Sequence, residues 1–154
     1  MIKIEDISPT IHEYFEEIFC LDNFSAFSVV VDGVEYKTAE HAFQSIKFLK
    51  TNKDIAEEIR LCSSPFDARN LAHQYKPFRR KDWKDVKYDI MEKILYEKTI
   101  QNEYVRERLL ATKGKKIVED CGVDDDKDWG CGIDGSGENN LGKIWMRIRD
   151  KLLK

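Results

Sequence analysis

Two stretches of this sequence carry residues whose types and spacing could do chemistry. The first runs from Asp124 to Gly142 (DDDKDWGCGIDGSGENNLG) and holds five of the chain's eight glycines, one tryptophan and several carboxylates. It lacks apolar periodicity, which predicts a loop. A loop of about 19 residues far exceeds the usual connection of about 4–6, and ordered loops of that length are typically functional. Glycines let a backbone approach a ligand closely and carboxylates offer acid–base or metal chemistry, so we consider this loop a candidate active site.

Two familiar motifs match this loop only superficially. Gly130–Gly135 has the spacing GxGxxG, but a dinucleotide site needs a strand before it and a helix directly after it. Here an acidic segment precedes the motif and more glycine follows, which argues against nucleotide chemistry of that type. The alternating aspartates of Asp124–Asp128 suggest an EF-hand start, but Trp129 and Gly135 stand where glycine and glutamate are required. We therefore predict no calcium site.

The second stretch is a predicted helix with a polar stripe on one side. At 100° per residue, Glu40, Gln44 and Lys47 project within an arc of about 60°. Such a stripe is ordinarily a solvated helix face. Phe43 and Phe48 flank it on both sides, however, and a polar stripe between aromatic residues favours a pocket wall. The periodicity alone favours the solvated face, and the flanking aromatic residues are the argument for the pocket wall.

A third, weaker group is the basic turn Lys76–Trp83 (KPFRRKDW) at the predicted start of a long helix. A helix N-terminus favours anions, and the guanidinium groups of Arg79 and Arg80 can bind phosphate with two hydrogen bonds each. Trp83 could line the same pocket. The alternative is a solvated basic turn with Trp83 packed into the core, and the sequence does not separate the two.

The elements that must position these residues are mostly helical, so we predict an α+β fold that is mainly α, with a small β-hairpin near the N-terminus. Asp32-Gly33 between β-branched runs predicts that hairpin over Phe27–Tyr36. Capping residues and apolar periodicity predict helices from Thr38 to about Leu49, Asp54 to Cys62, Pro65 to Leu71, Asp82 to about Gln101, Asn102 to Gly114 and Leu141 to Leu152, with a short strand in Lys116–Cys121. Ala42, Ile46 and Leu49 are predicted to face the core.

The amino-acid composition limits the classes of protein to which this sequence can belong. A chain of 154 residues, 42% hydrophobic and 36% charged, suits one domain over residues 1–154. No apolar run approaches the roughly 18 residues of a membrane helix and no signal-peptide pattern is present, so we expect a cytoplasmic protein without membrane partners. The four cysteines form no CxxC pair, which predicts free thiols rather than a zinc site. A net charge of −3 argues against general nucleic-acid affinity.

Taken together, these groups resemble the NADAR, or YbiA-like, family. The similarity covers about residues 20 to 153, with the motifs in the same order and at similar spacing. It is carried by Asp22-Asn23-Phe24-Ser25, Gly33–Phe48, Lys81-Asp82-Trp83, Asp126–Gly130 and Asn139–Gly142. The chain departs from the family pattern at Asp22, where serine is commoner, and at Glu138, where a lysine often stands.

The resemblance implies an N-glycosidase. Members of that family hydrolyse phosphorylated ribosylamine intermediates of riboflavin biosynthesis, or remove ADP-ribose from guanine in DNA and so undo the action of ADP-ribosyltransferase toxins. The implied partners are therefore an ADP-ribose or ribose-phosphate N-glycoside, ADP-ribosylated DNA and a cognate toxin. By the same resemblance, the active-site positions of the family correspond to Glu40, Lys47, Trp83, Asp126, Trp129 and Asn139, with Asn23 and Arg80 beside them.

The chemistry of an N-glycoside suggests roles for these residues. Cleavage through an oxocarbenium-like state needs two carboxyl groups, and cleavage through a ring-opened imine needs an amine nucleophile. We therefore predict Lys47, Glu40 and Asp126 as catalytic, without metal or cofactor. Predicted substrate-binding residues are Asn23, Phe24, Gln44, Arg79, Arg80, Trp83, Trp129, Gly130 and Asn139. A non-catalytic ADP-ribose-binding or antitoxin module is the alternative, but simple binding would not require this catalytic set.

Overall fold

The structure, a computed structural model, describes residues 2–5, 19–119 and 125–154. Its contacts divide the chain into two compact units. The first takes in the described residues up to Asp22 together with those from Asn102 onward, and the second is formed by residues 23–101. Of the residues singled out in the sequence, Asp124 and Cys121 lie outside the described part. That residues 1–154 form one domain stays a prediction.

The predicted hairpin is confirmed in the second unit. Strands β2 (Val29–Val31) and β3 (Val34–Tyr36) pair antiparallel across a turn in which Asp32 and Gly33 have φ values of 50° and 79°. Positive φ at both central residues is what a two-residue hairpin turn requires, and Asp-Gly tolerates it well. The free edge of β2 is paired by a side chain: the Gln101 amide accepts from Val30 N and donates to Val30 O, at 2.7 and 2.8 Å.

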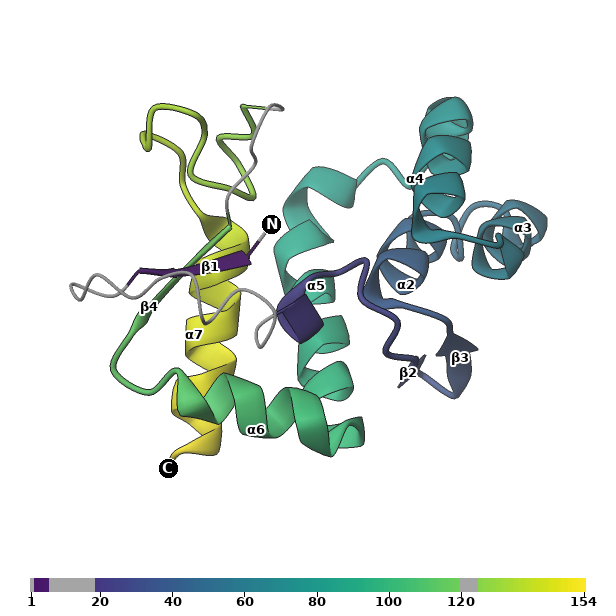
Figure 1. Cartoon of the computed structure of the whole chain (residues 1–154). Coiled ribbons are helices and arrows are strands. Elements are labelled where there is room, and N and C mark those ends of the chain that lie inside the picture. The colour runs from purple at the N-terminus through teal and green to yellow at the C-terminus, as the bar shows by residue number, and fades with distance from the viewer. Residues whose placement is uncertain (1, 6–18, 120–124) are drawn as a thin grey trace. The chain divides into compact units, whose positions relative to one another are not determined.

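Helices make up the rest of the second unit, and α2 lies among them, packed against three others and the hairpin (Figure 1). Their order is α2 (Ala39–Ile46), α3 (Lys53–Leu61), α4 (Pro65–Gln74), the 3-10 helix η3 (Lys76–Phe78) and α5 (Trp83–Gln101). Thr38, Asn52 and Ser64 cap the first three by accepting hydrogen bonds from backbone N–H groups one turn ahead. The mostly helical α+β fold predicted from the sequence is therefore confirmed.

The C-terminal end of α2 differs from the prediction. Helix α2 ends at Ile46, and Leu49, which was predicted to face the core, is 38% exposed. The chain leaves helical geometry before Leu49, so the 3.6-residue period no longer sets the direction of its side chain. Phe48 takes the core position instead, fully buried against Ile59 and the small residues of α4.

The first unit is built around a second small sheet. Strand β4 (Lys116–Glu119), predicted from the sequence, pairs antiparallel with β1 (Ile2–Glu5), which was not. The helical elements are η2 (Phe19–Leu21), α6 (Glu103–Ala111) and α7 (Asn140–Leu152). Helix α7 packs on β4 with its apolar face, and Arg149 ties it to the end of α6 by donating to Thr112 O and Lys115 O.

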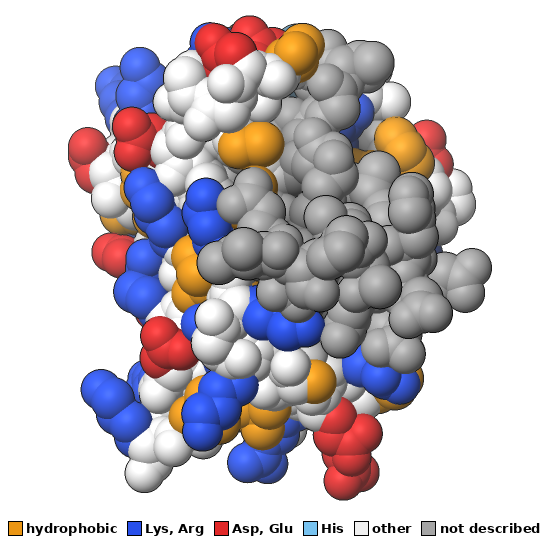
Figure 2. Space-filling view, turned by 60° about the vertical axis from the view of Figure 1, so that its left-hand side comes forward, with side chains coloured by type: hydrophobic (Ala, Val, Ile, Leu, Met, Phe, Trp, Pro, Cys, Tyr) orange, Lys and Arg blue, Asp and Glu red, His pale blue; other side chains and the backbone are white. Residues whose placement is uncertain are grey.

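One face of the molecule carries charged side chains of both signs. In Figure 2, Lys and Arg side chains are spread over the left-hand and lower parts of that face, with Asp and Glu side chains and small hydrophobic areas among them. None of the described helices is long and apolar enough to cross a bilayer.

A buried histidine makes the stability of the second unit depend on pH. His41 is 1% exposed, and its ring lies 2.9 Å from Thr38 Oγ1 and 3.1 Å from Cys62 O. Burial lowers the pKa of His41 below its ordinary 6.5, so below pH 6.5 the unfolded chain binds more protons than the folded one. We expect the contribution of His41 to the free energy of unfolding to fall as pH drops from 6.5 to 5.5.

Urea unfolding across that range, compared in the wild type and a His41→Gln variant, measures this effect. The exposed His73, exchanged for Gln, is the matched control and should leave the slope unchanged. An equal pH slope in the wild type and His41→Gln would show that His41 does not cause the loss.

Candidate active site

The polar stripe of α2 is a buried chain of hydrogen bonds. Gln44 Nε2 donates to Glu40 Oε1 at 2.6 Å, and Lys47 Nζ donates to Gln44 Oε1 at 2.5 Å. Glu40 is 6% exposed and Gln44 5%, so the interpretation of this stripe as a solvated face is wrong. The single amide of Gln44 therefore holds a carboxylate at one end and an amine at the other.

Aromatic rings enclose the amine end of this chain. Lys47 Nζ lies 5.0 Å from the ring centroid of Phe43 and 5.3 Å from that of Trp83. The two rings contact each other with centroids 4.9 Å apart, and both are almost fully buried. They supply an apolar wall whose faces also attract a cation.

This environment sets the charge of Lys47. Burial, the largest effect, lowers its pKa from 10.5 to about 8, although Glu40 acts in the opposite direction. Arg79 and Lys87 lower it further by repulsion of like charge. The effect of burial on the pKa therefore outweighs the attraction of Glu40. At pH 7 about a tenth of the molecules then carry a neutral Lys47 amine, against roughly three in ten thousand for an ordinary lysine.

Two backbone contacts hold the basic turn against the end of α2. Arg80 N donates to Lys47 O at 3.0 Å, and Thr51 Oγ1 donates to Phe78 O at 2.7 Å. The turn thereby brings Arg79 within electrostatic reach of Lys47. Lys87, one helical turn after Trp83 on α5, was missed from the sequence because a lysine on a long charged helix is usually a solvated one. Together these cations form the side of the site best suited to a phosphate.

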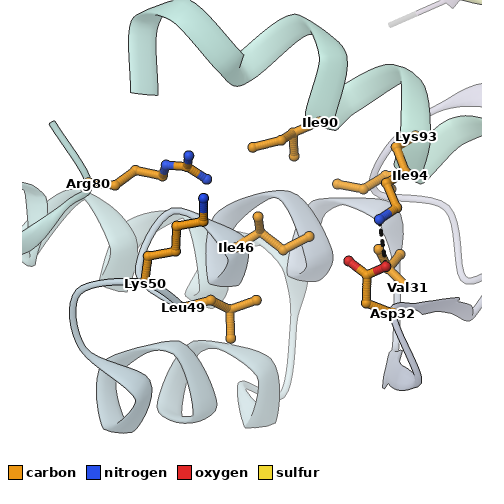
Figure 3. A pocket seen from close by; sticks show the side chains of 9 residues that line it. All are labelled: Val31, Asp32, Ile46, Leu49, Lys50, Arg80, Ile90, Lys93 and Ile94. Atoms are coloured by element: carbon orange, nitrogen blue, oxygen red, sulfur yellow. Dashed lines mark hydrogen bonds and ion pairs between the residues drawn. The ribbon is translucent and has the colours of Figure 1, made fainter. Parts of the chain in front are cut away.

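The side chain of Arg80 points elsewhere. Its guanidinium donates to both carboxylate oxygens of Asp82, at 2.6 and 2.7 Å. It also lines a cavity of about 180 Å³ between α2 and α5, drawn in Figure 3, where the side chains of Lys50 and Arg80 approach one another above an apolar floor. That volume is below the 300–1,000 Å³ of most ligand pockets, so this cavity is too small for a nucleotide. Whether Arg80 contacts substrate stays a prediction.

Asn23 lies beside the carboxylate end of the α2 stripe. Its backbone carbonyl accepts from Glu40 N at 3.0 Å, and its side-chain nitrogen lies 3.6 Å from the sulfur of Met91. Its side-chain oxygen is buried and receives no hydrogen bond from any described residue. A buried acceptor without a donor is costly, which suits a position that a substrate hydroxyl or amine could satisfy.

The glycine loop of the first unit, described from residue 125, is irregular as predicted. Asp126 organises its start, because Oδ1 accepts from the backbone N–H groups of Asp128 and Trp129, each at 2.9 Å. Asp128 is used differently: its Oδ1 accepts from the Asn140 side chain at 3.0 Å at the start of α7. The two aspartates therefore have separable roles.

Packing within the protein explains several other loop residues. Asn139 has φ = 52°, and its amide bridges to β4 by accepting from Glu119 N and donating to Ile117 O. A side chain at Gly137 would collide with the backbone of Gly130, and one at Gly142 with Ile117 O. At these two positions, glycine allows the loop backbone to pack closely against other backbone atoms of the protein. Ligand contact, the reason suggested from the sequence, is not needed to explain them.

Glu119 is a carboxyl group that the sequence did not single out. Burial raises its pKa to about 7, and the nearby carboxylates of Asp22 and Asp126 act in the same direction. Near neutral pH such a group can donate or accept a proton. No sequence pattern points to this residue, because only the fold brings the end of β4 to the loop. Among the described residues, no cluster of His, Cys, Asp or Glu side chains could hold a metal ion.

The predicted site residues fall into two sets. In the second unit the structure brings together Glu40, Gln44, Lys47 and Trp83, with Arg79 and Asn23 at the two ends. Trp129 and Gly130 lie with Asp126 in the loop of the first unit, where Trp129 O accepts from Leu141 N. That the two sets act on one substrate stays a prediction.

The comparisons with known proteins define the class. The model of the NADAR domain matches residues 11–153 of this chain, which therefore belongs to the NADAR family. The chain is 40% identical over 130 residues to the N-glycosidase YbiA of Escherichia coli strain K12, covering 84% of this chain and 79% of that protein. The NMR structure of E. coli YbiA matches with a TM-score of 0.77 at 39% identity, over 87% of this chain and 77% of that one.

A further relative carries a different name. A riboflavin biosynthesis protein of Vibrio vulnificus is 33% identical over 132 residues. The alignment covers 86% of this chain but 35% of that protein. The relatives of this chain therefore carry names of two kinds, N-glycosidase and riboflavin biosynthesis protein.

The lowered pKa of Lys47 can be tested without a substrate. The rate at which Lys47 reacts with an acylating reagent, followed by peptide mass spectrometry against pH, should give an apparent pKa near 8. Trp83→Ala, which admits water, should move it up towards 10.5, and Glu40→Gln should move it below 8. The exposed Glu107, exchanged for Gln, is the control and should change nothing. An ordinary pKa for Lys47 in the wild type would contradict the burial described here.

Proposed function

We propose that this protein is an N-glycosidase that cleaves the bond between ribose C1 and an exocyclic amine, with ADP-ribosylated guanine in DNA as its substrate. The observation that carries the proposal is Lys47: an amine with a pKa of about 8, fixed by Gln44 and enclosed by Phe43 and Trp83. A buried amine that is partly neutral at physiological pH is what Schiff-base chemistry on a sugar requires.

The steps follow from this geometry. Protonation of the ring oxygen opens the sugar and leaves an iminium between C1 and the exocyclic nitrogen. The neutral Lys47 amine adds to C1, a proton passes to the exocyclic nitrogen, and the base leaves as a free amine while C1 and Lys47 form an iminium. Water adds to C1, the C1–Lys47 bond breaks, and the released aldehyde closes to the sugar with Lys47 regenerated.

Carboxyl groups supply and remove the protons in these steps. Glu40 is connected to Lys47 through Gln44 and is the nearest candidate to receive the proton that the attacking amine loses. Asp126 is the predicted acid or base from the loop, and Glu119, whose pKa is raised to about 7 by burial, is a second carboxyl group that can exchange a proton near neutral pH. General acid–base assistance of this kind typically contributes about 10²–10⁴ in rate.

The second candidate substrate is a phosphorylated ribosylamine of riboflavin biosynthesis. The name of the Vibrio vulnificus relative favours it. Both substrates present a ribose C1 bonded to an exocyclic amine and flanked by phosphate, so Lys47, Arg79 and Lys87 would serve either one. They differ in the leaving group and in the presence of an adenosine moiety.

Incubation with each substrate, followed by chromatography and mass spectrometry of the released sugar, tests the proposed activity. We expect ADP-ribose to be released from guanine in a single-stranded oligonucleotide, and Lys47→Arg to lose activity as fully as Lys47→Ala because arginine cannot form the iminium. Faster release of ribose phosphate from the riboflavin intermediate would make the second candidate the substrate. No release from either would reject the N-glycosidase.

Asp126 and Asp128 form a matched pair for the acid–base role. Asparagine keeps the acceptor oxygen that holds Asp128 N and Trp129 N, so Asp126→Asn should leave the melting temperature nearly unchanged. It should nevertheless cut turnover by about 10²–10⁴. Asp128→Asn should have a much smaller effect on turnover. If Asp128→Asn is the more damaging change, the catalytic carboxylate in this loop has been assigned to the wrong residue.

Substitution of the two arginines in the basic turn should have different effects, one on substrate binding and the other on stability. Arg79 acts on Lys47 electrostatically, so Arg79→Ala should raise the Michaelis constant for a phosphorylated substrate several-fold. Arg80→Ala removes a nearly buried guanidinium from Asp82 and should mainly lower the melting temperature. Steady-state kinetics with thermal denaturation of both variants measures this. Unchanged Michaelis constants in both would return the turn to the solvated interpretation.

A further inference from the structure

Two phenylalanines and an arginine form a cluster on the second unit in which Phe66 and Arg69 are exposed and Phe24 is half-buried. Phe66 and Arg69 lie three residues apart on α4, and Phe24 comes from the segment before β2. The rings of Phe24 and Phe66 meet edge to face, with centroids 4.7 Å apart and an interplanar angle of 84°. The Arg69 guanidinium carbon lies 5.5 Å from the Phe24 centroid and 5.8 Å from that of Phe66.

This aromatic cluster is not part of the core. Phe66 is 58% exposed, and the apolar face of α4 is instead formed by Ala68 and Ala72, which are buried against Phe48. A phenylalanine left in water on a helix that already has a buried face gains little stability. Edge-to-face packing also leaves one ring with faces that its partner does not cover.

The cluster is connected to the candidate active site through the backbone. Phe24 directly follows Asn23, whose carbonyl accepts from Glu40 N at 3.0 Å. Along the chain, the cluster therefore begins one residue after the contact that holds the backbone of Glu40.

We propose that Phe24, Phe66 and Arg69 form a stacking site for a nucleobase. The link between this site and catalysis rests on the proposed function. Aromatic faces beside a guanidinium plane are the chemistry on which proteins stack bases of single-stranded nucleic acid. With a net charge of −3, the chain gains little binding free energy from general attraction to phosphates. Stacking on a base therefore has to supply a large share of the binding free energy. The base is either the adenine of ADP-ribose or a neighbour of the modified guanine.

Binding titrations separate these two sources without requiring turnover. The probes are ADP-ribose, followed by calorimetry, and a fluorescent single-stranded oligonucleotide of about ten nucleotides, followed by anisotropy. Phe66→Ala removes the exposed ring and Phe66→Trp preserves a stacking face. The control is Tyr104→Ala on α6, which removes another exposed ring that lies against a guanidinium, that of Arg108 at 5.1 Å.

We expect Phe66→Ala to weaken binding by roughly 5- to 100-fold, the range for loss of one base stack, and Phe66→Trp to restore it. If Phe66→Ala weakens the binding of ADP-ribose, adenine is the stacked base. If it weakens the binding of the oligonucleotide alone, the stacked base is a neighbour of the modified guanine. If Phe66→Ala binds both probes as well as Tyr104→Ala does, or if the wild type binds neither, the stacking site is rejected. These titrations measure binding and not turnover, so their result can be interpreted even if the glycosidase assay shows no activity.

Discussion

The contact between Lys47 and Gln44 is the interaction on which the candidate site depends. An ammonium enclosed by Phe43 and Trp83 loses hydration, and a full charge there would be costly. The lost hydration lowers the pKa of the amine, so that the amine exchanges its proton near physiological pH. The charge of Glu40 limits this shift, and Gln44 holds the amine and that carboxylate in one chain of hydrogen bonds.

The loop of the first unit meets a different constraint. It forms no helix or strand, and irregular backbone hydrogen bonds, such as those from Gly132 N to Asp126 O and from Gly137 N to Cys131 O, hold it together with side chains. Asp126 accepts from two backbone N–H groups, and Asn139 ties the loop to β4. Such a loop is held in one conformation without being buried. A carboxylate kept in place by its own backbone contacts is positioned before substrate arrives, which is the condition for efficient acid–base catalysis.

Local patterns made much of this structure predictable. Asp32-Gly33 specifies its turn through positive φ, and the spacing of Glu40, Gln44 and Lys47 places them on one side of α2 whatever else the chain does. What the sequence could not show depends on tertiary contacts. The burial of that stripe, the pairing of β1 with β4 and the surroundings of Glu119 and Lys87 all arise from segments distant in the chain. The early end of α2, which exposes Leu49, and the pairing of Arg80 with Asp82 are local, but no pattern in the sequence specifies them.

The central claim, that Lys47 is a nucleophile and not only a phosphate contact, has a direct test. Borohydride added during turnover reduces an iminium between Lys47 and sugar C1 to a stable amine. Intact-mass and peptide mass spectrometry should then find one sugar per chain, attached at Lys47, and none when the substrate is omitted. Undiminished turnover in borohydride, with no adduct on any lysine, would contradict the account and leave catalysis to the carboxylates of Glu40 and Asp126.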